Sequence, residues 1–480
     1  MATQLRRAIG LRTVVSASTG LAFAAVEFLA AAGLVAYVAG DAAWLAVAVA
    51  GGLLLLVWGY FSELNGLFPT AAAIRLYMAK AMDDRAALTI TFTYLLTIVL
   101  VVSADAYIIG SAITYVFDQA SWVAVVYIAL LLVTATLANL RGVRVAGAVQ
   151  DIATYTVLAG VVVICVIGLA RDGFALRTPF NPVDAGHPIT SFISAVALAI
   201  FLYSAFEWVT TNAEEVRDPR LIHRGMLISL GVLFVVCALI TLAMSHLLTS
   251  AELATAYPQL YLAQRAAGSI GLIAMLAVTA LTALNTFNGA FLTASRFMYA
   301  TAREGNLPPV FSRLNDKAAP WAPIVALGAA SLVCATLVAV TGAWQALVAT
   351  GAALESMIYA AAAYCVIRLR GRLKDTPRPF RMALAPLLAP VGLVIFTALA
   401  VLASITVGPD LNVTPLAIIL VTGTLSAAYT LLVIPELKRR DAARRAARGR
   451  RRPQRAPTAE ASQEVESAPV ESGMGPAPGE

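Results

Sequence analysis

Residues 193–219, ISAVALAIFLYSAFEWVTTNAEEVRDP, decide how the rest of the chain is interpreted. The stretch begins as an apolar helix. It then meets Ser204, Ala205 and the carboxylate of Glu207, halfway along a length that can span a membrane. An acid at that depth costs about 2.5–3.5 kcal/mol on membrane-insertion scales, so it marks a candidate functional site. The structural alternative is that Glu207 is paired inside a bundle and only holds helices together.

Composition places the whole chain in a membrane. Of its 480 residues, 60% are hydrophobic and only 13% are charged, whereas a soluble chain carries about 25% charged residues. Twelve apolar runs are each long enough to cross a hydrocarbon core of about 30 Å as a helix. These runs cover residues 16–39, 42–63, 86–117, 121–139, 145–170, 190–213, 225–248, 269–300, 322–343, 346–368, 382–406 and 413–436. The sequence therefore predicts an all-α membrane protein with twelve transmembrane helices, of which the two longest runs tilt or extend past the bilayer.

The same composition argues against several other classes. The four cysteines all lie inside apolar runs, without metal-ligand or redox spacing. We find no nucleophile–base arrangement, metal motif or phosphate loop, so we expect no enzyme, no cofactor and no metal. The net charge of +7 resides in loops and the tail, so we expect no nucleic-acid partner.

Lysine and arginine are distributed unequally between alternate loops. One set of loops, with the N-terminal residues, holds twenty-one of them, and the opposite set holds three. Because cytoplasmic loops are enriched in these residues, we expect a multi-pass protein of the plasma (cell inner) membrane with both termini in the cytoplasm.

The C-terminal tail, residues 438–480, divides into two parts. Residues 438–455 are strongly basic and follow the last apolar run, so we expect them on the anionic inner leaflet. Residues 456–480 carry five glutamates and no lysine or arginine, a composition typical of disorder. The tail is also the feature that could serve a non-transporting membrane sensor.

Four carboxylates lie in the middle of predicted spans: Glu27, Asp105, Glu207 and Glu355. No lysine or arginine lies at comparable depth, so each acid is protonated, shares a proton or waits for a cation. At about 3 kcal/mol each, the set would cost about 12 kcal/mol, comparable with the stability of a whole protein. For Asp105 and Glu355, a structural role is an equal alternative.

Aromatic and acidic residues surround Glu207 along the same stretch. Tyr203 and Trp208 can cover an ammonium or guanidinium group by cation–π contact, although packing is the alternative. Glu214 and Glu215 lie at the cytoplasmic end of the stretch. We interpret these two as structural residues that bond loop amides or arginines and help set a gate.

Four motifs resemble those of one family. The runs AFEWVTTNAEEVRDPRLIHRGM (205–226) and LNTFNGAFLTASRFMYATAREGNLPPVFSRLN (284–315) resemble the sixth and eighth helices of the amino acid–polyamine–organocation superfamily. ELNGLFPTAAAIRLYMAKAM (63–82) and VQDIATYTV (149–157) resemble its second and fifth helices. The resemblance implies a LeuT-type fold, which is a five-plus-five inverted repeat with two extra helices.

That fold implies a division of the chain into five segments. A cytoplasmic N-terminus would cover residues 1–15, the first repeat 16–170 and the second repeat 190–368. The extra helices would cover residues 382–436, and the tail would follow.

The resemblance also implies that helices 1 and 6 are broken and that substrate binds between them. Freed backbone groups and half-helix termini would hold it. The substrate site predicted from these segments and their neighbours consists of Ala24, Ala25, Glu27, Asp105, Phe201, Tyr203, Ser204, Ala205, Glu207 and Trp208.

The first helix departs from the family pattern. Where the family has a glycine–serine–glycine triplet, this chain has Ala24, Ala25 and Val26, followed by Glu27. The family's fifth-helix lysine, linked to proton coupling in some members, falls at Val157. Glu27 is therefore the predicted coupling group.

The leading functional hypothesis is a secondary active transporter, proton-coupled or an exchanger. It would move a cationic amine, a polyamine or a cationic amino acid by alternating access, with protons as a second partner. The alternatives are a neutral amino acid permease in which Glu27 is the coupling group, and a membrane sensor.

Overall fold

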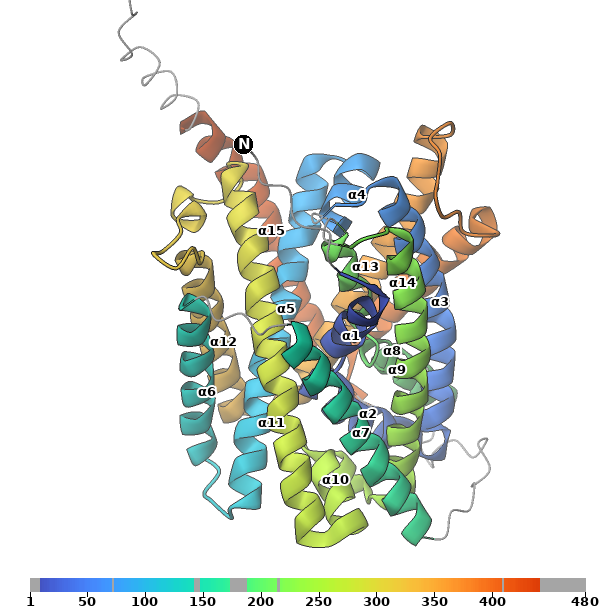
Figure 1. Ribbon diagram of the computed structural model, residues 1–480, viewed down its shortest axis with the longest axis vertical. Helices are drawn as coiled ribbons and strands as arrows, with labels where there is room; N and C mark the ends of the chain where they lie inside the picture. The colour runs from blue at the N-terminus through green and yellow to red at the C-terminus, as the bar shows by residue number, and fades with distance from the viewer. Residues whose placement is uncertain are drawn as a thin grey trace, which may run out of the picture.

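The computed structural model is almost entirely helical (Figure 1). It describes residues 9–70, 73–141, 147–172, 188–213, 216–407 and 410–440. The predictions for Glu214, for Glu215 and for the tail beyond residue 440 lie outside these residues. Within them, eleven helical stretches are long and apolar enough to cross a membrane, which confirms an all-α membrane protein.

The α-helices follow one another with short connections. In chain order they are α1 (Leu11–Ala22), α2 (Ala31–Ala39), α3 (Ala43–Leu67), α4 (Ala73–Ala81), α5 (Asp84–Val116), α6 (Val123–Leu140), α7 (Gly147–Arg171), α8 (Pro188–Phe201), α9 (Arg220–Leu247), α10 (Ser250–Leu253), α11 (Pro258–Arg303), α12 (Trp321–Thr341), α13 (Trp344–Arg372), α14 (Ala385–Ile405) and α15 (Thr414–Ala428).

Several shorter elements interrupt or extend these helices. Two are π-helices, η1 (Ala25–Ala30) and η5 (Tyr429–Val433). Three are 3-10 helices, η2 (Gly40–Ala42), η3 (Phe206–Asn212) and η4 (Pro309–Ser312). Two strands of two residues each, β1 (Thr406–Val407) and β2 (Asp410–Leu411), form an antiparallel pair.

Each of the twelve predicted spans falls on a helical segment, although eleven candidate spans are counted. The difference arises in the first span. Its first part, α1, has only 12 residues. Its second part continues through η2 into α3 as one stretch of 40 residues, Phe28–Leu67. An interruption inside the first span therefore explains the count.

The two longest runs exceed the thickness of a bilayer core, as predicted. The 33 residues of α5 make a helix about 50 Å long, against a core of about 30 Å. The 46 residues of α11 bend at Ala267 and Gly268. Gly268 has φ +61, a left-handed conformation that glycine adopts without a steric penalty.

The first span is interrupted near its middle. Helix α1 ends at Ala22, Phe23 leaves the helical conformation (φ −93, ψ 37), and the chain resumes as η1 at Ala25. Ala24 and Ala25, two residues of the predicted substrate site, lie at this interruption. The segment from α1 to α2 lies near the centre of the bundle in Figure 1.

The sixth predicted span is interrupted in the same manner. Helix α8 ends at Phe201, and Ala205 takes the left-handed conformation (φ 67) before η3 begins. The two interrupted spans lie side by side, because the Ser18 hydroxyl of α1 donates a hydrogen bond of 2.6 Å to the carbonyl of Phe206. Two broken helices therefore meet inside the bundle.

Helix α13 encloses this centre from one side. In the most apolar 18-residue segment of α13, 89% of the residues are buried. The helix packs against α3, α4, α5, α8 and α14. Its middle, TGAALESMIYAAAAY (350–364), is rich in alanine and glycine, which lets neighbouring helices approach closely. By contrast, only 17% of the 18 residues of α6 are buried, and α6 lies at the edge of the bundle in Figure 1.

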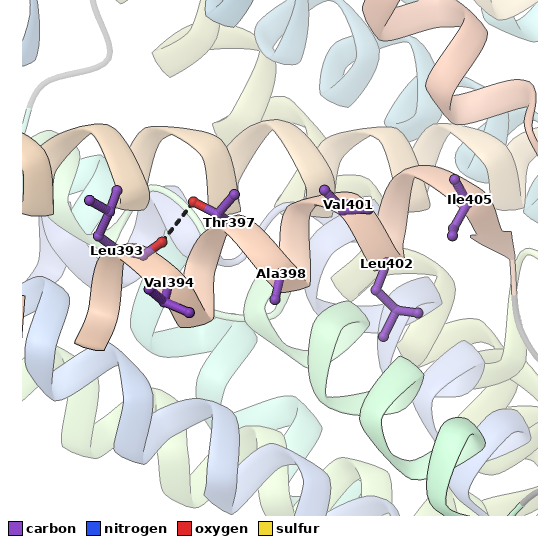
Figure 2. A pocket seen from close by; sticks show the side chains of 7 residues that line it. All are labelled: Leu393, Val394, Thr397, Ala398, Val401, Leu402 and Ile405. Atoms are coloured by element: carbon purple, nitrogen blue, oxygen red, sulfur yellow. Dashed lines mark hydrogen bonds between the residues drawn. The ribbon is translucent and has the colours of Figure 1, made fainter. Parts of the chain in front are cut away.

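The outer face of α14 carries a shallow groove (Figure 2). Seven residues of this one helix line it: Leu393, Val394, Thr397, Ala398, Val401, Leu402 and Ile405. Thr397 is the only polar side chain among them, and its hydroxyl donates to the Leu393 carbonyl at 2.7 Å. The side chains that line the groove are therefore apolar, apart from one hydroxyl that bonds its own helix.

Candidate functional site

Glu355 of α13 holds the interrupted sixth span through a single carboxylate oxygen. Its Oε1 accepts hydrogen bonds from the Ser204 hydroxyl at 2.5 Å, from the Ala205 N–H at 3.3 Å and from the Tyr94 hydroxyl at 3.2 Å. The Glu355 residue is fully buried. Because burying a charge is costly unless it is hydrogen-bonded, the three donors explain how this acid is accommodated.

Glu207, in η3, is the second buried acid of the site. It is 1% exposed, and its Oε2 accepts a hydrogen bond of 3.3 Å from the Tyr359 hydroxyl. Tyr359 follows Glu355 by one turn of α13, and residues four apart share a helix face. One face of α13 therefore reaches both the break and η3.

Each of these carboxylates keeps one buried oxygen, Oε1 of Glu207 and Oε2 of Glu355, that has no hydrogen-bond partner in the described part of the chain. The two acids interact electrostatically with each other. Among the described residues, no arginine or lysine forms an ion pair with either of them. Two buried acids without a cation are protonated, share a proton or accept a cation from outside the protein.

Aromatic side chains connect this pair to α5. The indole N–H of Trp208 donates to the Tyr94 oxygen at 2.6 Å, and their rings meet edge to face with centroids 5.8 Å apart. Tyr94 in turn donates to Glu355. A continuous network of hydrogen bonds thus joins α5, the break, η3 and α13.

Glycine 351 lets the broken span approach α13. A Cβ atom at Gly351 would lie 2.5 Å from Cζ of Phe201, the last residue of α8. Gly351 precedes Glu355 by one helical turn, so this close approach brings Ser204 within reach of the carboxylate. The glycine at position 351 and its packing against Phe201 therefore determine where the break lies relative to Glu355.

Tyr203, predicted in the same site, is directed elsewhere. It is fully buried, its hydroxyl donates to the Val47 carbonyl of α3 at 2.9 Å, and its ring packs against Gly51. The structure therefore joins Tyr203 to α3. It does not join this side chain to the two acids.

Asp105 lies on the same helix as Tyr94 but at a different depth. It is fully buried in α5, eleven residues beyond Tyr94, which corresponds to about 16 Å along the helix axis. Helix α5 also contacts η1 of the first span. Asp105 thus lies about three helical turns from Tyr94 along α5.

The residues predicted in the first span lie at its interruption. Ala24 is fully buried, and its carbonyl accepts a hydrogen bond of 2.8 Å from the Phe28 N–H. The backbones of Ala25 and Glu27 belong to η1. Their side chains lie outside the described part of the structure, so the predicted roles of Glu27 stay predictions.

Sequence reasoning did not include three members of this network in the predicted site. Glu355 was identified as a mid-span acid, and Tyr359 follows it at helical spacing, which is a signal that could have joined them. Tyr94 lies in a long apolar run, and nothing in its local pattern distinguishes it. Only the folded arrangement brings Tyr94 to Glu355, 261 residues away.

Two broken helices that meet inside an apolar bundle define a class of protein. Such interruptions near the middle of spans form the substrate sites of secondary transporters. A model of the amino acid permease family matches residues 9–426. The chain belongs to this family of membrane transporters, and it is not an enzyme.

Curated relatives agree with this family. The chain is 24% identical over 261 residues to the branched-chain amino acid permease BcaP of Lactococcus lactis, covering 53% of this chain and 56% of that protein. It is 25% identical over 258 residues to the vacuolar cationic amino acid transporter 4 of Arabidopsis thaliana, covering 50% and 40%. The chain thus spans about half the length of these relatives.

A solved structure agrees with the fold. The chain is similar to a histidine-to-alanine mutant of the manganese transporter of Eremococcus coleocola, with a TM-score of 0.56 and 14% identity. The similarity covers 90% of this chain and 98% of that protein. This confirms the predicted LeuT-type transporter fold.

Proposed function

We propose that this protein is a secondary active transporter for a small cationic amine, a polyamine or a cationic amino acid. The observation that carries the proposal is the buried pair Glu207 and Glu355, beside a broken helix and without an arginine or lysine partner among the described residues. A substrate cation supplies the charge that this pair lacks.

In this proposal the substrate binds between the two interrupted spans. Glu207 and Glu27 bind its cationic group, and Trp208, which is half-buried beside Glu207, covers that group by cation–π contact. Backbone groups freed at the breaks near Ala24 and Ala205 hold the remaining polar atoms. Glu27 carries the coupling proton, and Asp105 assists from α5.

The distribution of basic residues supports an orientation. With twenty-one lysines and arginines on one side and three on the other, both termini face the cytoplasm. The basic segment 438–455 then lies on the anionic inner leaflet, where its charges are attracted to lipid headgroups.

One observation favours a second candidate, a neutral amino acid permease. Oε1 of Glu355 already accepts three hydrogen bonds from the protein, so this oxygen needs no substrate cation. The branched-chain permease BcaP, a relative of this chain, is named for a neutral substrate. In this candidate Glu27 is a protonatable coupling group that does not contact substrate.

A thermal-shift screen of the purified protein separates the two candidates. A ligand that binds only the folded state stabilises it by RT ln(1 + [L]/Kd), about 2.7 kcal/mol at one hundred times Kd. We expect putrescine, agmatine or arginine to raise the melting temperature, and we expect Glu207→Gln to lose that rise. A response to leucine or alanine only would favour the neutral permease, and no response to any of them would contradict both.

A further inference from the structure

We infer that Glu355 is a positioning residue whose ionised carboxylate fixes the break at Ser204–Ala205, and whose protonation loosens it. The inference deepens the proposed function, since the break lies in the proposed substrate site. It assigns to Glu355 a role in shaping that site, separate from binding the substrate.

The first argument comes from the backbone of the break. An interrupted helix leaves N–H groups without their usual carbonyl partner. Ala205, held in the left-handed conformation (φ 67), donates its N–H to Glu355 Oε1 at 3.3 Å. The preceding side chain, Ser204, donates to the same oxygen at 2.5 Å. Glu355 therefore replaces the carbonyl that a continuous helix would have supplied.

The second argument comes from the direction of the hydrogen bonds. Trp208 can only donate, and it donates to the Tyr94 oxygen, which directs the Tyr94 proton to Glu355. All three contacts at Oε1 are therefore received by the carboxylate. Its other oxygen, Oε2, is buried and has no partner among the residues that the structure describes, so a proton placed there would have no acceptor among them. The geometry suits the ionised acid.

The third argument concerns the charges around Glu355. Among the described residues, the titratable groups that interact with it are Tyr94 from α5, Glu207 from η3 and Tyr359 from α13. Burial and the Glu207 carboxylate oppose a charge on Glu355, whereas the donors at Oε1 favour it. The ionised form of Glu355 is thus stabilised by the three donors at Oε1, and the negative charge in turn holds these donors in position.

The reactivity of one cysteine next to the break can show whether the break has loosened, and this measurement needs no substrate. The Cys237 thiol of α9 is fully buried and lies 3.7 Å from the Leu202 carbonyl, which accepts its hydrogen bond. Cys165 of α7 is buried to the same extent and serves as an internal reference. Alkylation by N-ethylmaleimide, quantified for both thiols by mass spectrometry, gives a Cys237-to-Cys165 ratio in which the common effect of pH on thiols cancels.

We expect this ratio to rise in the wild-type protein when the pH falls from about 8 to about 5.5, because burial and the Glu207 carboxylate favour the protonated form of Glu355. Glu355→Gln should raise the ratio about tenfold at the higher pH, because losing charge-assisted hydrogen bonds costs about 1.4 kcal/mol or more. The ratio of this variant should then vary little with pH. Ser204→Ala should give a smaller rise and keep the pH dependence.

Ser356→Ala is the matched control, since Ser356 is the buried neighbour of Glu355 and its hydroxyl has no partner. A wild-type ratio and pH profile in Glu355→Gln would overturn the inference. If that variant does not fold, unchanged ratios in both Ser204→Ala and Tyr94→Phe would overturn it instead. A failure of every ligand in the thermal-shift screen would contradict the proposed function and leave this measurement intact.

Discussion

Replacing Glu27 or Glu207 by glutamine is expected to change substrate binding, and the two variants should differ in the pH dependence of uptake. Glu27→Gln is expected to bind a cationic substrate about tenfold more weakly, or about 1.4 kcal/mol, and to lose the pH dependence of uptake, because it removes the coupling carboxylate. Glu207→Gln should weaken binding and leave that pH dependence in place. Binding and uptake assays at two pH values check both variants. Unchanged affinity and an unchanged pH profile in Glu27→Gln would contradict both the coupling role of Glu27 and its contact with the substrate.

Glu252, in the short helix α10 between two spans, gives a pH-dependent prediction. Burial raises the pKa of its carboxyl, but hydrogen bonds from Thr249 and Arg265 outweigh burial and leave the pKa below its ordinary value. A group with a lowered folded pKa contributes stability above its unfolded pKa of about 4.3, and this stability is lost as the pH falls through the folded pKa.

Glu252→Gln should therefore be less stable than the wild type at neutral pH, and the difference should shrink as the pH falls below about 4. Because the two partners are 21% and 44% exposed, solvent screening limits the effect to about 1 kcal/mol or less. Thermal unfolding in detergent at several pH values measures it. A difference that grows in acid would contradict the account.

Among the elements, α13 and the broken span depend on close packing at Gly351. Gly351→Ala would bring a methyl group against the Phe201 ring, and overpacking of this kind costs about 1–3 kcal/mol. Gly371→Ala on the same helix is the control, because a Cβ there meets nothing within 4 Å. We expect a lower melting temperature for Gly351→Ala only. Equal melting temperatures for the two variants would show that the break does not need this contact.

An ion-pair cluster fixes α3 to α13 and to the loop before α14. Glu63, which is 1% exposed, accepts hydrogen bonds of 2.8 and 2.5 Å from Arg370 and one of 3.0 Å from the Met382 N–H, and Arg378 lies 3.1 Å from it. Glu63→Gln leaves two largely buried arginines without their counter-charge, which should cost about 3–5 kcal/mol. Thermal unfolding checks this prediction, with Glu436→Gln in the exposed pair Glu436–Arg440 as a control. A loss in Glu63→Gln no larger than in the control would contradict it.

The membrane-spanning helices could be predicted from the sequence, whereas most side-chain contacts between them could not. All twelve spans were located because the bilayer demands about 20 consecutive apolar residues. The break in the sixth span was predicted from the resemblance to a family whose sixth helix is broken, and Glu207 marked this span as a candidate site. Helix α4, with nine residues, was too short to give this signal. The pairing of Ser204 with Glu355 joins positions 151 residues apart, and no local pattern encodes that distance. For the same reason the direction of Tyr203 toward α3 could not be predicted.

At the scale of the whole molecule, an apolar bundle encloses buried acids. The family match places the chain among the amino acid permeases, and two of its central spans are interrupted. We propose a cationic substrate because a cation stabilises these buried acids where lipid and apolar side chains cannot. The central claim is therefore that this protein moves a cationic amine through the site between the broken spans.

Uptake of labelled putrescine or arginine by proteoliposomes containing the full chain tests that claim most directly. Liposomes without protein give the background, and Glu207→Gln gives the variant in which the site is weakened. We predict protein-dependent uptake that is inhibited by unlabelled putrescine and agmatine and is unchanged by leucine and alanine. Transport that only leucine or alanine competes with would contradict the claim of a cationic substrate.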